Sequence, residues 1–511
     1  MKNELLVRGR WIITGGAVDD PVHCEAAVLV GDDGRIQAVD RWRALRERHP
    51  QAQVIGSDRF AVLPGLVNAH HHAGGISHVQ HGVPDRLLEP WILSLRGRRP
   101  GDSRLDTLVS AARLLRSGVT AVVDVESDGG SPETWAETMD RALRAYEETG
   151  LRVAFAPGIK NQSHLVAGRG EDARFLAALP RNAREAAQAL LPAPGDIGED
   201  DYLDIMRGLV ERYRSHPRVD VWFGPPGPQW VSDPFMQRIA EAAQALDTGI
   251  QTHVVESFYE KLHGPRFYGQ STVAHLRDLG VLSPRFSIAH GVWLTEEEIA
   301  ILAETGAAVS HNPSSNLRLR AGIAPLNALL AAGVTVGIGM DGTTLDDDED
   351  MFTEMRLALR LNRTPFVGSA APTPSRILEL ATAGGARLLR AMGLGRLAPG
   401  AEADLVLVDV AHATWPWTAP EADPRDLVLL RARAGDVHTV LIGGEAVLRE
   451  GIPTRFDAEA AVRELADTVG AAPYPETALR GLSVLLPHLE AWYGGWDAPE
   501  CRPYTPYNSR D

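Results

Sequence analysis

The feature that most constrains the fold is an alternation of short β-branched runs with longer helix-like stretches in the middle of the chain. Helix-like segments lie at 106–117, 134–149, 200–215, 233–246 and 295–304. The last begins with Thr295 and Glu298 in the spacing of a capping box. Eight runs are typical of strands, at 66–72, 120–126, 153–159, 219–224, 250–255, 286–290, 307–311 and 334–339. This alternation predicts an α/β fold with a (β/α)8 TIM barrel over residues 64–390, whose catalytic side chains lie at the carboxyl ends of the strands.

Both ends of the chain differ from this middle part. Short apolar runs and the turn pair Asp33-Gly34 are typical of a β-hairpin near the N-terminus. A similar texture returns at 403–409 and 437–445. We therefore predict that residues 1–63 and 391–451 build one small β-sandwich domain together. Residues 452–511 are expected to form a helical C-terminal extension, with helices at 457–469 and 476–493 before a polar, aromatic tail.

Composition excludes several classes of function. The 511 residues include 51 basic and 67 acidic side chains, and the resulting formal charge of −16 argues against a partner that is a nucleic-acid polymer. No apolar run approaches the roughly 20 residues that span a bilayer, and no signal-peptide core follows Met1. We expect a cytoplasmic protein without a membrane partner. Only Cys24 and Cys501 are cysteines, which leaves the 17 histidines as the candidate metal ligands.

The first chemical signal is the run Asn68-Ala69-His70-His71-His72 at the end of the first predicted barrel strand. Side chains alternate along a strand, so His70 and His72 point the same way and His71 points into the layer between strands and helices. Two neutral imidazoles spaced in this way suit Zn²⁺ or Fe²⁺. The alternative at this point is a group of exposed loop histidines.

Ionisable residues also end three later strands. His253 ends the fifth and is followed by Glu256, His290 ends the sixth, and Asp341 follows the eighth. Taken singly, each has an ordinary structural explanation, such as a buried histidine or an Asp-Gly turn. Their coincidence on the rim where a barrel builds its site favours a catalytic centre.

The chain resembles the metal-dependent amidohydrolase superfamily, in the branch of triazine hydrolases and of cytosine, guanine and 8-oxoguanine deaminases. The resemblance covers about residues 4–451. Its motifs are 64–72, the pair His253 and Glu256, 289–298, 310–320, 339–342 and 395–406.

This resemblance implies one divalent metal ion, most simply Zn²⁺ with Fe²⁺ as the alternative, bound by His70, His72, His253 and Asp341. Glu256 and His290 would then be acid/base and polarising groups, and Asp341 would accept a proton as well as bind the ion. A cation held by three imidazoles and one carboxylate lowers the pKa of its water from about 15.7 toward about 7, so the expected nucleophile is a metal-activated hydroxide.

The substrate-binding residues are predicted from residue type alone. Aromatic and amide groups suit a flat, nitrogen-rich ring. The candidates are Gln80, His81, Trp91, Gln162, Gln229, Trp230 and His311.

The leading hypothesis is a hydrolytic deaminase of a small nucleobase-like or triazine-like heterocycle, a hydrolase of non-peptide C–N bonds. A second enzymatic alternative is an amide, amidine or cyclic amide hydrolase, or a chlorohydrolase, with the same centre. A third is a catalytically silent scaffold that keeps the fold. The resemblance also implies a homodimer or homotetramer.

Overall fold

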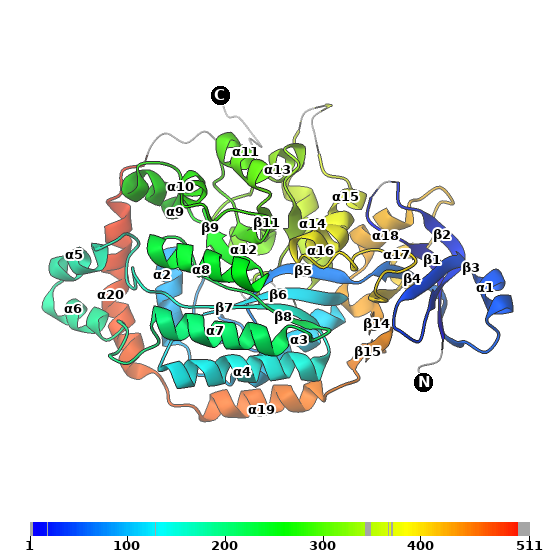
Figure 1. The fold of residues 1–511 in the computed structure, drawn as a ribbon, viewed down its shortest axis with the longest axis horizontal. Helices are drawn as coiled ribbons and strands as arrows, with labels where there is room; N and C mark the ends of the chain where they lie inside the picture. The colour runs from blue at the N-terminus through cyan, green and yellow to red at the C-terminus, as the bar shows by residue number, and fades with distance from the viewer. Residues whose placement is uncertain are drawn as a thin grey trace.

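The computed structural model describes residues 4–17, 19–127, 129–342, 349–365, 367–368 and 371–498. Its architecture is a helix-covered barrel with a sheet domain at one side (Figure 1). In Figure 1 the blue N-terminal strands and the orange segments near residue 440 lie together in this sheet domain. None of the helices in the described ranges is both long enough and apolar enough to cross a membrane.

The barrel contains the eight predicted strands in the predicted order. They are β5 (Leu66–His71), β6 (Val119–Ser127), β7 (Arg152–Gly158), β8 (Val219–Val221), β9 (Ile250–Val254), β10 (Phe286–His290), β11 (Ala308–His311) and β12 (Val336–Ile338). The wall of the barrel consists of two four-stranded halves, β5-β6-β7-β8 and β9-β10-β11-β12. Neighbouring strands within each half pair in parallel.

Backbone contacts join the two halves at both seams. A parallel bridge links Phe223 to Ile250 on one side. On the other side, the amides of Met340 and Asp341 donate to the carbonyl oxygen of His70 at 3.2 and 3.1 Å. The second seam therefore holds the end of β5 directly against the residues that follow β12.

Helices follow the strands around the outside of the barrel. They are α2 (Leu88–Ser94), α3 (Ser103–Arg116), α4 (Pro132–Thr149), α5 (Glu171–Ala178), α6 (Arg181–Gln188), α7 (Glu199–Tyr213), α8 (Asp233–Leu246), α9 (Phe258–His263), α10 (Thr272–Asp278), α11 (Glu296–Thr305), α12 (Pro313–Arg318), α13 (Leu326–Ala331), α14 (Met351–Leu361), α15 (Pro374–Glu379) and α16 (Gly385–Leu388). The capping box predicted for Thr295 and Glu298 is present at the start of α11. The (β/α)8 prediction is confirmed.

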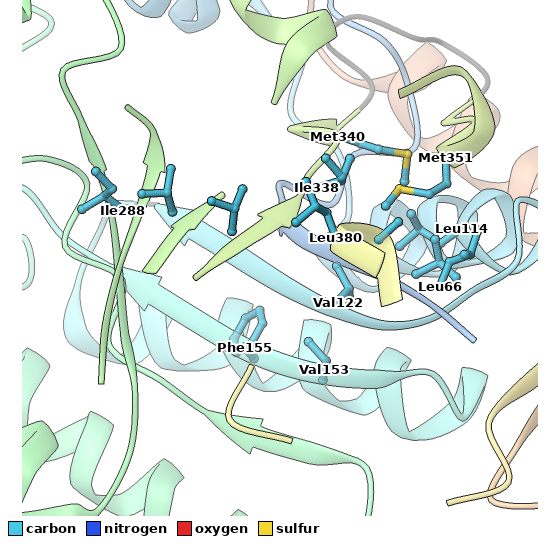
Figure 2. Packing of buried hydrophobic residues seen from close by; sticks show 14 of the residues in the cluster. Leu66, Leu114, Val122, Val153, Phe155, Ile288, Ile338, Met340, Met351 and Leu380 are labelled. Atoms are coloured by element: carbon cyan, nitrogen blue, oxygen red, sulfur yellow. The ribbon is translucent and has the colours of Figure 1, made fainter. Parts of the chain in front are cut away.

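The largest apolar cluster fills the layer between the barrel strands and the helices. Leu66, Val122 and Phe155 of the strands lie in it with Leu114 of α3 and Met351 of α14 (Figure 2). A second cluster, which includes Val67, Ala121, Val123, Ala154 and Trp222, contains the residues that alternate with these along the strands. The strands are thus apolar on both faces, as a parallel barrel requires.

A β-bulge interrupts the alternation at the end of β5. Asn68 is paired with Val122 of β6, but the next pair is His71 with Asp124, so three residues of β5 advance opposite two of β6. The extra residue reverses the alternation that Leu66 and Val67 begin. His71 consequently faces helix α3, where its Nε2 lies 2.7 Å from the hydroxyl of Ser110.

The sheet domain takes strands from both ends of the chain. Its order is β16-β15-β14-β13-β4-β1-β2-β3. The N-terminal strands are β1 (Leu5–Ile13), β2 (Val22–Val30), β3 (Ile36–Arg41) and β4 (Gln53–Pro64), and the later ones are β13 (Leu405–Asp409), β14 (Val437–Ile442), β15 (Glu445–Arg449) and β16 (Ile452–Pro453). Helices α1 (Trp42–Arg48), α17 (Ala411–Thr414) and α18 (Pro424–Arg431) accompany them. The antiparallel pair of β4 with β13 joins the two ends of the chain.

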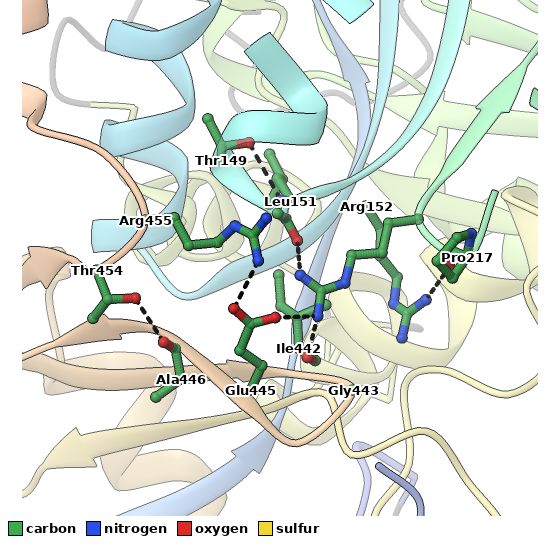
Figure 3. Close-up of polar contacts among 12 residues, drawn as sticks. Thr149, Leu151, Arg152, Pro217, Ile442, Gly443, Glu445, Ala446, Thr454 and Arg455 are labelled. Carbon is green, nitrogen blue, oxygen red and sulfur yellow. Dashed lines mark hydrogen bonds and ion pairs between the residues drawn. The ribbon is translucent and has the colours of Figure 1, made fainter. Parts of the chain in front are cut away.

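Arginine–carboxylate contacts connect this domain to the barrel. The guanidinium of Arg152, at the start of β7, lies 2.8 and 3.0 Å from the two carboxylate oxygens of Asp404. Arg218, just before β8, donates to Glu445 at 2.8 Å, and Arg455 donates to the other oxygen of Glu445 at 2.7 Å (Figure 3). The amino ends of two barrel strands are thereby tied to the sheet domain through paired charges.

Two helices form the C-terminal extension, α19 (Ala458–Ala471) and α20 (Glu476–Gly494). Leu465 of α19 packs in a small cluster with Leu105 and Leu108 of α3. The apolar face of α20 packs against α5 and α6 and against Leu93 of α2. Both predicted helices are present and cover the chain's own barrel, whereas residues 499–511 of the tail lie outside the described part.

Candidate metal centre

The structure brings the ionisable strand ends together on one rim of the barrel. Nε2 of His72 lies 3.1 Å from Nε2 of His253. Oδ1 of Asp341 lies 3.2 Å from Nε2 of His70 and 3.2 Å from Nε2 of His72. The ligand atoms of His70, His253, His290 and Asp341 all lie within 4.8 Å of one another. Residues up to 271 positions apart in sequence therefore converge on one point, because the carboxyl ends of parallel strands meet there.

The outward-facing nitrogens show which tautomer the three predicted histidine ligands adopt. Nδ1 of His253 lies 2.7 Å from the carbonyl oxygen of Pro226, and Nδ1 of His72 faces the carbonyl oxygen of Val125. A carbonyl oxygen only accepts hydrogen bonds, so both Nδ1 atoms carry a proton. In the neutral rings, both Nε2 atoms then present lone pairs to each other across 3.1 Å.

His70 has the same arrangement through a side-chain amide. Its Nδ1 lies 2.8 Å from Oε1 of Gln251. The oxygen and nitrogen of the Gln251 amide cannot be exchanged without loss of a hydrogen bond, because its Nε2 donates to the carbonyl oxygen of Ala69 at 2.9 Å. His70 therefore donates from Nδ1, and its buried Nε2 has no hydrogen-bond partner among the described residues.

These observations form a direct test of whether the residues suit a divalent cation, and they do. Three imidazole lone pairs and a carboxylate oxygen converge on one point, and a cation is the species that such a set binds. Burial and then the neighbouring rings of His70 and His72 lower the pKa of His253 well below its usual value, so its imidazole is neutral at physiological pH. Each ring is oriented by a hydrogen bond to its other nitrogen, as is usual for metal-bound histidine.

His290 has different surroundings from the other three rings. Its Nδ1 faces two side-chain amides, those of Asn316 and Asn312, at 2.9 and 3.3 Å, whereas each of the other three rings faces a single carbonyl oxygen. Amides offer both donors and acceptors, so either tautomer of His290 can be accommodated. Its Nε2 lies 3.5 Å from Oε2 of Glu256 and 3.7 Å from Oδ2 of Asp341. The ring thus adjoins both the carboxylate expected to move protons and the ligand set.

Glu256 lies in an environment that favours its protonated form. Burial raises its pKa well above the usual range, and the carboxylates of Glu260 and Asp341 raise it further. Its Oε1 is buried and has no hydrogen-bond partner in the described part of the chain. For Asp341, burial also raises the pKa, but the close imidazoles of His70 and His72 outweigh it and hold the pKa well below its usual range. The site therefore favours the protonated form of Glu256 and the ionised form of Asp341.

The backbone at this rim adopts uncommon conformations. Val255, His290 and Asp341 have φ angles of 45°, 75° and 57°, in the left-handed region that costs non-glycine residues energy. At Gly339 an added Cβ would lie 2.3 Å from Oδ1 of Asn312 and 2.9 Å from the amide nitrogen of His70. The close approach that positions these ligands therefore requires glycine at 339.

Comparison with known proteins bears on the family. The Amidohydrolase family profile matches residues 61–447 of this chain. The chain belongs to the amidohydrolase family. It is 31% identical over 470 residues to a 5-methylthioadenosine/S-adenosylhomocysteine deaminase from Nitratidesulfovibrio vulgaris, covering 91% of this chain and 96% of the relative. It is 32% identical over 445 residues to an 8-oxoguanine deaminase from Pseudomonas aeruginosa, covering 86% and 93% of the two chains.

A solved structure agrees with this placement. A zinc-bound adenosine deaminase from Xanthomonas campestris superposes with a TM-score of 0.77 at 27% identity, covering 92% of this amidohydrolase and 99% of that chain. The predicted family is confirmed, and the protein is a hydrolase that acts on C–N bonds other than peptide bonds.

The predicted substrate-binding residues of the amidohydrolase occupy several places. Gln162, Gln229 and Trp230 meet at one loop, where Nε2 of Gln162 lies 3.3 Å from the carbonyl oxygen of Gln229. Nε2 of Gln229 donates to Oε1 of Glu260 at 2.5 Å, and the ring of Trp230 lies 4.1 Å from Nζ of Lys160. These contacts place Gln229 beside the segment that carries Glu256.

The other four candidates are dispersed. Trp91 packs against His78, and Gln80 accepts a hydrogen bond from the amide of Ser77 in its own loop. His81 is half-buried in the same loop. His311 is buried, its ring nitrogens have no partner among the described residues, and burial lowers its pKa to about 4. Roles in substrate binding stay predictions for all seven residues.

Sequence reasoning missed several residues that orient the site. Gln251 holds His70, and the hydroxyl of Ser315 donates to Oδ2 of Asp341. Glu349 accepts a hydrogen bond from Ser110, the partner of His71. Ser315 lies in the motif over residues 310–320, so that motif offered a signal for it. Gln251 precedes His253 by two residues on the same strand, which is the signal that could have found it.

Proposed function

We propose that this amidohydrolase is a zinc-dependent aminohydrolase that releases ammonia from a nitrogen heterocycle of nucleobase or nucleoside size. The observation that carries the proposal is the convergence of three imidazole lone pairs beside a buried, protonated Glu256. The relatives named as 5-methylthioadenosine/S-adenosylhomocysteine deaminase and 8-oxoguanine deaminase support the amino group as the leaving group. The zinc in the Xanthomonas campestris structure supports the choice of metal.

The bound ion would be held by His70, His72, His253 and Asp341, and it would supply Lewis acidity that makes a water molecule a nucleophile near neutral pH. Glu256 donates its proton to the ring nitrogen next to the carbon under attack, because its raised pKa keeps a proton available. It then takes up the proton of the hydroxyl group added to that carbon and passes it to the departing amine, so that the carbonyl product and ammonia form. Nε2 of His290 donates a hydrogen bond to the oxygen on which charge develops, and Asp341 accepts the proton of the attacking water.

The experiment is an ammonia-release screen of zinc-reconstituted protein over aminopurines, aminopyrimidines, aminotriazines and pterins. Glu256→Gln should lower kcat by at least about a thousandfold without loss of zinc, since it removes the proton donor and leaves the ligands in place. Zinc content by elemental analysis and an unchanged melting temperature control for misfolding. An undiminished rate in this variant, or no ammonia from any compound, would contradict the proposal.

A further inference from the structure

A second acidic group borders the segment that carries Glu256, and the proposed chemistry does not use it. Glu89 lies in the first turn of α2. Glu260 lies in α9, the helix that begins two residues after Glu256. Glu260 is 6% exposed, and the carboxylate atom Oε2 of Glu89 is buried. Neither side chain forms an ion pair with a basic residue in the described ranges. Three carboxyl groups, those of Glu89, Glu256 and Glu260, are thus gathered at this wall without a balancing lysine or arginine.

Hydrogen bonds connect the three groups in a fixed order. The amide of Glu256 donates to Oε2 of Glu260 at 2.6 Å. The amide of Glu260 donates to the hydroxyl of Ser257 at 3.1 Å, and that hydroxyl donates to Oε1 of Glu89. The Ser257 hydroxyl thus accepts one hydrogen bond, from the Glu260 amide, and gives its single proton to the carboxylate of Glu89. Oε1 of Glu89 is therefore held by Ser257, the residue that directly follows the proposed proton donor Glu256.

The other oxygen of Glu89 remains without a donor. Glu260 has both oxygens satisfied, by Gln229 and by the amide of Glu256. Oε2 of Glu89 has no hydrogen-bond partner among the described residues, although water does not reach it. Burial, with a smaller contribution from Glu260, raises the pKa of Glu89 to about 7. A buried oxygen with free lone pairs is costly unless a partner arrives from outside the chain.

We propose that Oε2 of Glu89 accepts a hydrogen bond from an N–H or O–H group of the substrate, so that Glu89 is a specificity-determining residue. The substrate class is then a nitrogen heterocycle that carries a hydrogen-bond donor on its ring edge or on a ring substituent. A heterocycle with a lone pair or a methyl group at that position leaves Oε2 unpaired and binds less tightly. This inference rests on the proposed function, which it deepens by naming the substrate's donor.

The anchoring by Ser257 makes one variant especially informative. In Glu89→Gln the Ser257 hydroxyl can keep its proton on the carbonyl oxygen of the new amide, as it donates to Oε1 of Glu89. The NH2 group then takes the place of Oε2. A position that accepted a hydrogen bond becomes one that donates, with almost no change in shape. The preference for a donor on the substrate should therefore reverse toward an acceptor.

The test measures dissociation constants by calorimetry at pH 8 for zinc-loaded protein. Two matched pairs serve as probes. 8-Oxoguanine carries an N–H where guanine has a nitrogen lone pair, and adenosine carries hydroxyl groups that 2′,3′-di-O-methyladenosine lacks. The wild-type protein should bind the donor-bearing member of at least one pair about tenfold or more tightly, as expected for a hydrogen bond to a charged group. Glu89→Gln should lower that ratio at least tenfold.

Two further variants separate this role from a general loss of structure. Glu490→Gln, a matched change at an exposed glutamate of α20, should leave the ratio unchanged. Ser257→Ala frees the amide or carboxylate of residue 89 to turn, so Ser257→Ala combined with Glu89→Gln should lose the reversal. Zinc content and melting temperature are measured for each protein.

Equal binding of both members of each pair by the wild-type protein overturns the inference, as does an unchanged ratio in Glu89→Gln or failure of all four probes to bind. The wild-type comparison decides this even if a variant does not fold. The proposed function fails separately, if donor-bearing probes bind with the predicted preference but no ammonia is released from them.

Discussion

The two rims of the same barrel both carry charged side chains, and they differ in whether those charges are paired. At the amino end of β7, Arg152 donates twice to the carboxylate of Asp404. Before β8, Arg218 donates to the carboxylate of Glu445, which Figure 3 shows, and to the carbonyl oxygen of Ile442. At the carboxyl ends, Nε2 of His70, Nε2 of His290 and Oε1 of Glu256 have no hydrogen-bond partner among the described residues. The paired charges at the amino rim connect the two domains, whereas the unpartnered polar atoms at the carboxyl rim are available to an ion and a substrate.

The difference also appears in the backbone. Residues at the carboxyl rim, such as Val255 and His290, adopt left-handed conformations that the surrounding packing has to stabilise. At the amino rim, the turns before β6 and β7 have glycines, Gly118 and Gly150, at their left-handed positions, and Asp247 before β9 is a non-glycine exception. The left-handed residues at the carboxyl rim therefore lower the stability of the fold, and the arginine–carboxylate contacts at the amino rim help to offset this cost.

The largest effect should come from breaking the ligand set at the carboxyl rim. Asp341→Ala removes the carboxylate that contacts both His70 and His72, and zinc affinity should fall by about a hundredfold or more. His290→Ala should keep the zinc and lower kcat by about a hundredfold to a thousandfold, because it removes a hydrogen-bond donor to developing charge. Zinc titration and steady-state kinetics measure the two effects. Equal loss of zinc in both variants would show that His290 is a ligand.

An intermediate effect is expected at the opposite rim. Arg152→Ala leaves the carboxylate of Asp404, which is 2% exposed, without its cationic partner, and the free energy of unfolding should fall by about 3 kcal/mol. Zinc content of the folded protein should not change. Arg48→Ala, which removes an exposed ion pair with Asp40, is the matched control and should cost less than about 1 kcal/mol. Loss of zinc in Arg152→Ala would contradict the separation of the two rims.

The smallest effect concerns pH and His311, a buried ring just below the carboxyl rim. Its pKa is about 4 in the folded protein and 6.5 in the unfolded chain, so the folded state binds fewer protons between these values. The contribution of neutral His311 to the free energy of unfolding is complete above pH 6.5 and is lost as the pH falls toward 4. The loss amounts to about 2 kcal/mol at pH 5. Metal-free His311→Phe should therefore lose less thermal stability between pH 7 and pH 5 than the metal-free parent. The same loss in both proteins would assign the acid sensitivity to other groups.

The sequence was sufficient for the barrel because its strands are short, β-branched and separated by well-capped helices, as at Thr295 and Glu298. It also placed His70, His253 and Asp341 on one rim, since strand ends share an edge whatever lies between them. The bulge in β5 was not predictable, because no residue type in Asn68-Ala69-His70-His71 marks it. Simple alternation from Val67 would have turned His71, not His70, toward the inside.

Contacts between distant segments explain what else the sequence did not reveal. The hydroxyl of Ser257 meets Glu89, which is 168 positions away, and nothing local to either residue indicates that contact. Asn316 was accessible only as part of a motif, and its contact with Nδ1 of His290 became visible once the strands were assembled. Residues that orient a site act through pairs, and pairs are set by the tertiary structure.

Helix α20 has a consequence for the order in which the molecule is completed. It packs against α2, the helix that carries Glu89, and the hydroxyl of Tyr493 accepts a hydrogen bond from the amide of Ala167. All proposed metal ligands precede residue 342, more than a hundred residues before α20 begins at Glu476. During synthesis, every proposed ligand therefore leaves the ribosome well before the helix that packs against α2.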